Sequence, residues 1–116
     1  ATFADATGMS VTISTGAHRC LITVVASAHN SSTNNMMLDI DLDGARLGAV
    51  TYGLIVVKGE ITFNRNMSFS YLTDVLSAAS HTFKLQLARE SSGTFTLFAS
   101  SAVVPLVLGV QEINSP

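Results

Sequence analysis

The stretch that decides the fold is HTFKLQLARESSGTFTLFAS, residues 81–100. Polar and apolar residues alternate through both of its halves, and this period of two is typical of strands with one buried face. The apolar set is Phe83, Leu85, Leu87, Phe95, Leu97 and Ala99. The polar run RESSGT between the halves predicts a β-hairpin whose apolar face builds the core. Its outer Thr, Gln and Ser side chains offer a contact surface without reactive groups.

Alternation of the same kind runs through the rest of the chain, without a long amphipathic helix. It predicts strands at MSVTIS (9–14), RCLITVVASA (19–28) and PLVLGVQEI (105–113). Residues 19–28 are apolar on both faces, so we expect this strand to lie at the centre of a sandwich or at a subunit interface. HNSSTNN (29–35) reads as a polar loop, and LTDVLSAAS (72–80) as a loop or one helical turn.

A second hairpin is predicted at MLDIDLDGARLGAVTYGLIVV, residues 37–57, where Asp43 and Gly44 make the tight turn. Leu38, Ile40 and Leu42 are expected to point one way. Asp39 and Asp41 then point the other way, which predicts an acidic outer face in solvent.

The clearest strand by pattern is ITFNRNMSFSY, residues 61–71. Its shared apolar face is expected to carry Ile61, Phe63, Met67, Phe69 and Tyr71. Arg65 interrupts this face. We expect that a bulge turns it outward or that it pairs with an acid such as Asp74 or Glu112 at a buried interface, a structural role rather than anion binding.

Together these runs give about eight strands separated by turns in a chain of 116 residues. We therefore predict one all-β domain over residues 1–116, an antiparallel β-sandwich or jelly roll. A chain of this length buries a substantial core.

Charge is scarce in this chain. Charged residues make up 12% of the sequence, about half of the roughly 25% that is usual for soluble domains. Two explanations are open: a monomer coated with Ser and Thr, or a homo-oligomer whose subunit faces are apolar or hydroxylated. We favour the homo-oligomer.

The composition also argues against several classes of partner. The net charge is −2, and the six Lys and Arg residues are scattered: Arg19, Arg46, Lys58, Arg65, Lys84 and Arg89. Nucleic-acid binding needs a clustered positive face, so we do not expect it. There is no apolar run of the length that spans a membrane, and the first ten residues do not read as a signal peptide.

The run DIDLDG is similar to the opening of an EF-hand calcium loop, with Asp39, Asp41, Asp43 and Gly44 in place. That loop requires a Glu at its twelfth position, which is Val50 here, so no metal site is predicted. His18, His29 and His81 lack the spacing of zinc ligands, although a three-fold axis would bring copies of one of them together.

Catalytic groups are also poorly provided for. There is no G-x-S-x-G elbow for a serine nucleophile. The acidic residues read mostly as strand-edge or loop positions in solvent, and with no Trp and two Tyr an aromatic platform for sugars is lacking. Cys20 lies in an apolar run and is expected to be a buried, inert thiol. We predict no catalytic residue, no cofactor and no enzymatic activity.

Three stretches carry a family resemblance: DATGMSVTISTGAHRCLITV (5–24), SHTFKLQLARESSGTFTLFAS (80–100) and PLVLGVQEI (105–113). They resemble the TNF/C1q-like jelly-roll domains of bacteriophage virion proteins. In that group a strand opening with His-Thr-Phe precedes a hairpin with Ser-Gly-Thr, and a short apolar strand ending in Glu-Ile closes the sheet.

The resemblance implies a jelly roll that forms a homotrimer and serves in the virion, on the surface of the phage particle. Because the sequence shows no collagen-like repeat, we expect a capsid decoration protein bound to the major capsid protein or another virion protein. Such a protein stabilises the assembled shell by mass action. The alternative is a receptor- or glycan-binding module of a phage tail or fibre, reading its ligand with loops such as 29–35. A C1q-like signalling or matrix domain is a weaker third reading.

Overall fold

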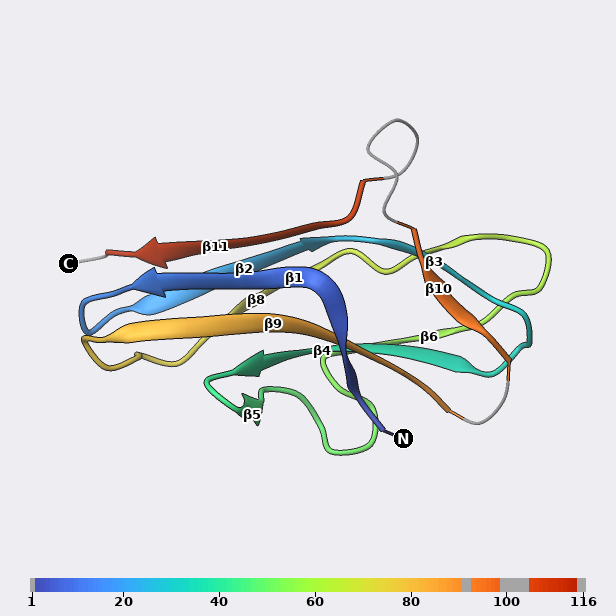
Figure 1. Ribbon diagram of the computed structural model, residues 1–116, viewed down its shortest axis with the longest axis horizontal. Coiled ribbons are helices and arrows are strands. Elements are labelled where there is room, and N and C mark those ends of the chain that lie inside the picture. The colour runs from blue at the N-terminus through green and yellow to red at the C-terminus, as the bar shows by residue number, and fades with distance from the viewer. Residues whose placement is uncertain (1, 91–92, 99–104, 115–116) are drawn as a thin grey trace.

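The computed structural model describes residues 2–90, 93–98 and 105–114, and these residues form strands and loops only (Figure 1). The strands are β1 (Ala4–Ser14), β2 (Arg19–Val25), β3 (Ser27–Asn30), β4 (Asn35–Leu42), β5 (Ala45–Arg46), β6 (Ile55–Lys58), β7 (Arg65–Asn66), β8 (Phe69–Leu72), β9 (Ser80–Arg89), β10 (Phe95–Leu97) and β11 (Val107–Ile113).

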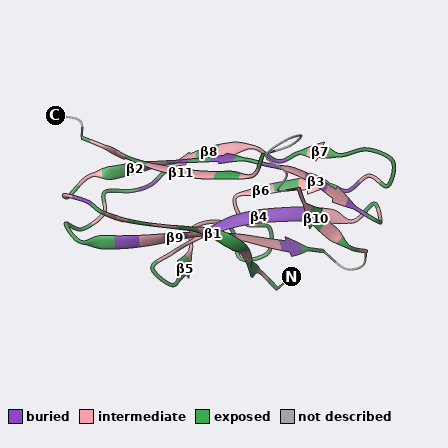
Figure 2. Ribbon diagram, turned by 45° about the horizontal axis from the view of Figure 1, so that its top comes forward, coloured by how far each residue is buried: buried purple, intermediate pink, exposed green. Residues whose placement is uncertain are grey.

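The strands pack as two antiparallel layers with the buried residues between them (Figure 2). The first layer has the order β1-β9-β4, and β5 and β6 both pair with the remaining edge of β4. The second layer consists of two three-stranded sheets, β11-β2-β8 and β10-β3-β7, whose central strands β2 and β3 follow each other along the chain. The predicted antiparallel β-sandwich is confirmed. Its jelly-roll connectivity stays a prediction.

The middle of the second layer is one extended stretch, residues 20–30, in which β2 and β3 follow each other. Every even-numbered residue is buried: Cys20, Ile22, Val24, Ala26, Ala28 and Asn30. The stretch is central in its layer, which confirms one of the two positions predicted for it. The outer side of the stretch is only partly covered, because Val25 is 40% exposed.

The strand β9 supplies the core of the first layer. Phe83 and Leu85 are fully buried, and Leu87 packs against them. Phe95 and Leu97 reach the same core from β10, so the apolar face predicted for this region is confirmed. Ala99 lies outside the described residues.

The hairpin predicted for residues 81–100 is wrong. Both edges of β9 are occupied along most of its length, by β1 from Ser80 to Leu87 and by β4 from Phe83 to Arg89, which leaves little edge for a returning strand. The chain instead crosses to the second layer, where Phe95 pairs with Asn30 of β3.

The long strand predicted for residues 61–71 is also wrong, because only its second half is extended. The strand is interrupted at Ser68. The Ser68 hydroxyl accepts a 3.0 Å hydrogen bond from the Ala26 amide, and Ser side chains can replace backbone groups as hydrogen-bond partners in this way. Met67 is buried, and Phe69 and Tyr71 pack against the core as expected.

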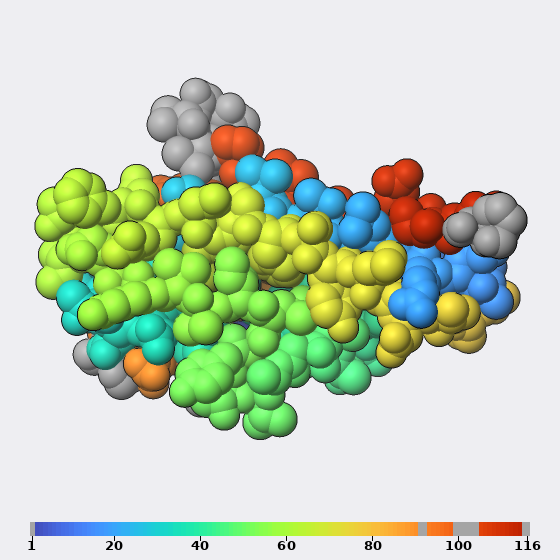
Figure 3. Space-filling view, turned by 180° about the vertical axis from the view of Figure 1, so that it is seen from behind, coloured from blue at the N-terminus to red at the C-terminus, as the bar shows by residue number. Residues whose placement is uncertain are grey.

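Residues 59–64 form a loop at one end of the molecule (Figure 3, upper left). Ile61 and Phe63, which were expected on the apolar face, are 57% and 65% exposed there.

The turn between β4 and β5 is as predicted. Asp43 and Gly44 have φ angles of 53° and 94°, and two positive φ angles in succession define the type I′ turn that suits a tight hairpin. Residues 73–79 form a loop between β8 and β9 without a helical turn.

The two phenylalanines at 63 and 83 provide a matched test of this core. We expect Phe83→Ala to lower the free energy of unfolding by about 3–5 kcal/mol, because it empties a fully buried site. Phe63→Ala should change it by less than about 0.5 kcal/mol, since that side chain is largely in solvent. Urea unfolding followed by circular dichroism measures both; equal losses would contradict this packing.

Candidate interaction surface

The outer side of the β11-β2-β8 sheet carries no charged side chain over three successive rows. The register sets Leu21 beside Leu72 and Gln111, Thr23 beside Ser70 and Gly109, and Val25 beside Val107. Residues directly opposite each other in a sheet share a face. We call these eight residues the uncharged face.

Apolar side chains on the uncharged face are open to solvent. Val25, Leu72 and Val107 are 40%, 48% and 44% exposed. The next row carries a charged side chain, Arg19, which begins β2 and lies beside Ile113. Large exposed apolar surfaces on soluble proteins commonly mark contact sites.

The outer side of the first layer is different, because charged residues run along it. Asp41 lies beside Lys84, and the Lys84 Nζ is 3.8 Å from the Asp5 carboxylate. Asp5 also accepts a hydrogen bond from Gln86 at 2.8 Å. The outer side of the first layer therefore carries charged side chains, whereas the uncharged face carries none.

Asp39 corrects the predicted acidic outer face. It points away from Leu38 and Ile40 as expected, but it is fully buried rather than solvated. Its carboxylate accepts a 2.7 Å bond from the Arg46 guanidinium and a 2.9 Å bond from the Gly48 amide. Asp39 thus anchors the segment that follows β5.

Arg46 holds several groups together over this buried carboxylate. Its guanidinium donates to the carbonyl oxygens of Ala49 and Val50 and lies 4.0 Å from the centroid of the Phe3 ring. A cation stacked on an aromatic face is attracted by the ring quadrupole. The N-terminal segment and the 47–54 segment are therefore fixed by the same side chain.

The carboxylates that suggested calcium have separate protein partners. Asp39 binds Arg46, Asp41 accepts from the Gly44 amide at 3.1 Å, and Asp43 binds His81 at 2.6 Å. Over residues 2–90, 93–98 and 105–114, no group of three His, Cys, Asp or Glu side chains is placed to hold a metal ion. The prediction of no metal therefore rests on the broken loop motif and on these competing bonds.

The three histidines lie in three different settings. The ring of His81 contacts Asp43 and the Ser77 carbonyl, while the Nδ1 of His18 is 2.6 Å from Glu112. His29, predicted for a loop, lies in β3 and contacts the Ile61 carbonyl at 2.8 Å.

The surroundings of Glu112 and Cys20 shift the pKa of both side chains. Hydrogen bonds from His18 and from the Gly16 amide hold the pKa of Glu112 below its ordinary value. Burial, helped by the charge of Glu112, raises the pKa of the Cys20 thiol. The predicted burial of Cys20 is confirmed, and a buried thiol with a raised pKa is a poor nucleophile.

Arg65 follows neither of the alternatives expected for it. Because it pairs with buried Ala28, it faces inward without a bulge. Among the described residues no acid lies within ion-pairing distance of it, and its Nε is buried without a hydrogen-bond partner. Asp74 and Glu112, its expected partners, lie beside Arg19 and His18 instead.

The polar loop predicted for residues 29–35 is shorter than expected, because Asn30 ends β3 and Asn35 begins β4. Buried Asn30 donates to the Asn34 carbonyl at 3.2 Å and accepts from the Ser32 amide at 3.1 Å. Gly59 and Gly93 pack so closely here that a Cβ on either would lie within 3 Å of this loop. The side-chain amide of Asn30 is therefore poorly placed to bind a sugar.

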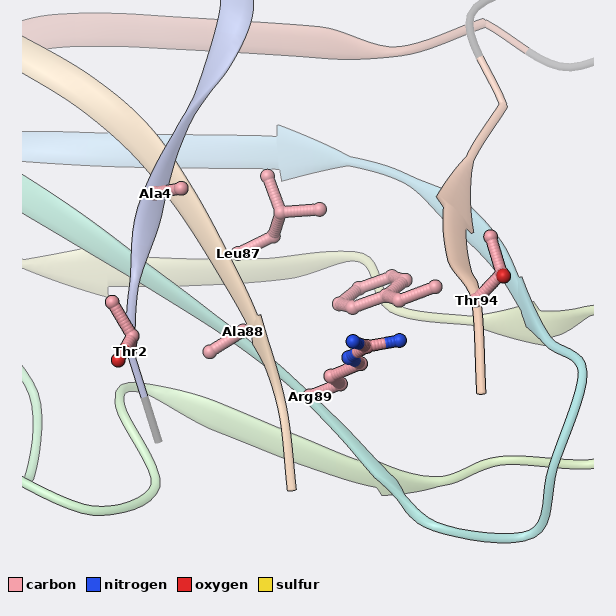
Figure 4. A pocket seen from close by; sticks show the side chains of 7 residues that line it. Thr2, Ala4, Leu87, Ala88, Arg89 and Thr94 are labelled. Atoms are coloured by element: carbon pink, nitrogen blue, oxygen red, sulfur yellow. The ribbon is translucent and has the colours of Figure 1, made fainter. Parts of the chain in front are cut away.

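One hollow of about 330 Å³ opens between the start of β1 and the end of β9 (Figure 4). Its lining consists of Thr2, Ala4, Leu87, Ala88, Arg89, Thr94 and Phe95. This set contains no pair of nucleophile and base, and no pair of carboxylates. The hollow therefore offers no arrangement for the reactions considered above.

Comparison with protein-family models, with curated proteins and with solved structures found no match to this chain. In the part of the chain that the structure describes, no helix is long and apolar enough to cross a membrane.

Removing the guanidinium over Asp39 should be costly. We expect Arg46→Met to lower the free energy of unfolding by about 3 kcal/mol, because it leaves a buried carboxylate without its ion-pair partner. Exposed Arg89 is the control, and Arg89→Met should cost less than about 0.5 kcal/mol. A double-mutant cycle with Asp39→Asn checks the cause; additive losses would show that the two side chains are not coupled.

Divalent cations should leave the protein unchanged. A ligand present at a hundred times its Kd would stabilise the fold by about 2.7 kcal/mol, a shift that calorimetry resolves readily. We expect the same melting temperature in calcium, in magnesium and in a chelator. A rise in calcium alone would show that the Asp39, Asp41 and Asp43 region binds this ion after all.

Proposed function

We propose that this protein is a non-enzymatic structural protein that acts by binding and associates as a homotrimer through its uncharged face. The observation that carries the proposal is the absence of charge over three rows of this face, with exposed Val25, Leu72 and Val107 on it. Surfaces that pair permanently are depleted in charged residues at their centre.

A three-fold ring needs a heterologous contact, in which one surface of each copy meets a different surface of the next copy. The uncharged face is one such surface, and a neighbour that covers it leaves no charge buried without a partner. The scarcity of charge in the sequence as a whole, 12%, agrees with a subunit that hides part of its surface.

The setting we propose is a bacteriophage particle, where the trimer decorates the capsid and bridges copies of the major capsid protein. This part rests on the resemblance to TNF/C1q-like virion domains, together with the antiparallel sandwich. Its jelly-roll connectivity belongs to the same proposal. Binding only to the assembled shell would stabilise that shell by mass action.

Reading a receptor or glycan at a phage tail is the less supported function. It would need loop polar groups directed to solvent, whereas those of Asn30 and its neighbours bind within the loop. A glycan array that gives clear hits would reverse this preference.

Two valines of similar exposure test the interface. Light scattering on a sizing column should give three times 12.2 kDa across a dilution series. Val25→Asp, on the uncharged face, should weaken association by about a hundredfold or more, because it places an unpaired charge in the contact. Val56→Asp, 43% exposed in the first layer, should leave the trimer intact.

A wild-type mass of 12.2 kDa would overturn the trimer, and a Val25→Asp variant that stays trimeric across the dilution series would overturn the choice of face. Co-sedimentation with assembled phage capsids then tests the decoration role separately. A stable trimer that ignores capsids would retain the interface and remove the virion setting.

A further inference from the structure

We propose that His81 is a proton-dependent clamp that fixes the 73–79 loop to the first layer and releases it when the imidazolium loses its proton. The inference concerns the end of the sandwich where the chain passes from β8 to β9, and it does not depend on the proposed function. It stands on the placement of His81, which is 6% exposed between two hydrogen-bond acceptors.

Both ring nitrogens of His81 face oxygen atoms. Nδ1 lies 2.6 Å from the Asp43 carboxylate and Nε2 lies 2.8 Å from the Ser77 carbonyl. A carboxylate and a carbonyl only accept, so both contacts are satisfied together only by the doubly protonated ring. A neutral imidazole has one N–H and must give up one of the two bonds.

Few other charges act at this position. Asp43 is the one charged group that acts on His81 among the described residues. From β1 the ring faces Ile13, its partner in the ladder. Asp41 and Lys84 lie together on the outer side of the layer, while His18 and Glu112 pair with each other.

The bond to Ser77 is the one that the neutral ring gives up. The bond to Asp43 is assisted by the charge of the carboxylate and is about twice as strong as a bond to a neutral acceptor. The Ser77 carbonyl also has a second donor, the Thr15 hydroxyl at 3.2 Å. Nε2 then turns its lone pair toward the Ser77 oxygen, and the two repel.

The Ser77 bond is one of few that hold the loop at this point. Beside it, Ala79 accepts from the Thr15 amide at 2.9 Å and Leu76 donates to the His18 carbonyl at 2.8 Å. The turn holding Asp43 is fixed independently, because Asp43 also accepts from the Thr82 amide at 2.8 Å. Loss of the proton should therefore loosen the loop and leave the turn in place.

The direction of the pH dependence follows from the same bonds. The Ser77 carbonyl first, and then Asp43, raise the pKa of His81 above its ordinary value of 6.5. The stabilisation is thus complete when the pH is below the pKa that His81 has in the unfolded chain. It is lost as the pH rises through the pKa that His81 has in the folded chain. The pKa of Asp43 is lowered by His81 and by the Thr82 amide, so this carboxylate stays ionised throughout that range.

Amide hydrogen exchange by NMR tests the clamp, with rates corrected for the intrinsic effect of pH. We expect the protection of the Thr15 and Leu76 amides to fall about three- to tenfold as His81 titrates. The amide of Thr82 should keep its protection. Imidazole nitrogen shifts should show that the neutral ring carries its proton on Nδ1.

The variants distinguish His81 from its neighbours. His81→Gln should abolish the pH-dependent step, while His29→Gln, a histidine in β3, and His18→Gln should retain it. The clamp would be overturned if His81→Gln showed the same pH-dependent fall in protection, or if the wild type showed none. Loss of protection at Thr82 instead of at Thr15 and Leu76 would also overturn it. If His81→Gln does not fold, the wild-type nitrogen shifts decide alone, since a neutral ring protonated at Nε2 contradicts the proposal.

Discussion

The fold depends on the full pairing of β9. With β1 on one edge and β4 on the other, this strand satisfies its backbone groups inside the first layer and cannot accept a further partner. Its inner side chains, Phe83 and Leu85, are fully buried and need a second apolar surface opposite them. The chain after β9 therefore has to leave the layer, and β10 pairs with β3 on the other side of the core. Saturation of one strand is what makes the molecule a sandwich instead of a wider single sheet.

The two layers of this sandwich are finished differently on the outside. In the first layer the outer side carries Asp41 and Lys84, and the Phe3 ring stacks on the Arg46 guanidinium that pairs with buried Asp39. Burying such a pair is costly unless every remaining oxygen is bonded, and here the Gly48 amide supplies a further bond. In the second layer the outer side has only hydroxyl, amide and apolar groups over three rows. The outer side of the first layer is partly covered by the chain's own N-terminal and 47–54 segments. The uncharged face is not covered in this way, and its lack of charge suits contact with a neighbouring molecule.

Alternation and turn residues predicted part of the structure correctly, although the apolar face expected at Ile61 and Phe63 was wrong. Burial of Cys20, Ile22 and Val24, the inward direction of Phe83 and Leu85, and the turn at Asp43 and Gly44 follow from local pattern. Strand pairing was predicted wrongly at residues 81–100, since alternation identifies a face but not the neighbour. The Asp39–Arg46 pair was within reach, because the turn at Asp43 fixes the register that brings Arg46 close. Burial of Asp39 was not predictable, because it depends on how Gly48 and Gly53 of the 47–54 segment pack onto β4, which alternation does not indicate.

The histidine contacts show where reasoning from sequence ends. His81 and Asp43 are 38 residues apart and meet because the β4–β9 register, continued beyond Leu42, places Asp43 against Thr82. No motif signals such a meeting; it is a product of the sheet. The same register that buries the core thus places an ionisable ring between two acceptors at one end of the molecule. The loop held by this ring follows directly after β8, a strand of the uncharged face. Stability, surface chemistry and the response to protons are in this way set by one pattern of strand pairing.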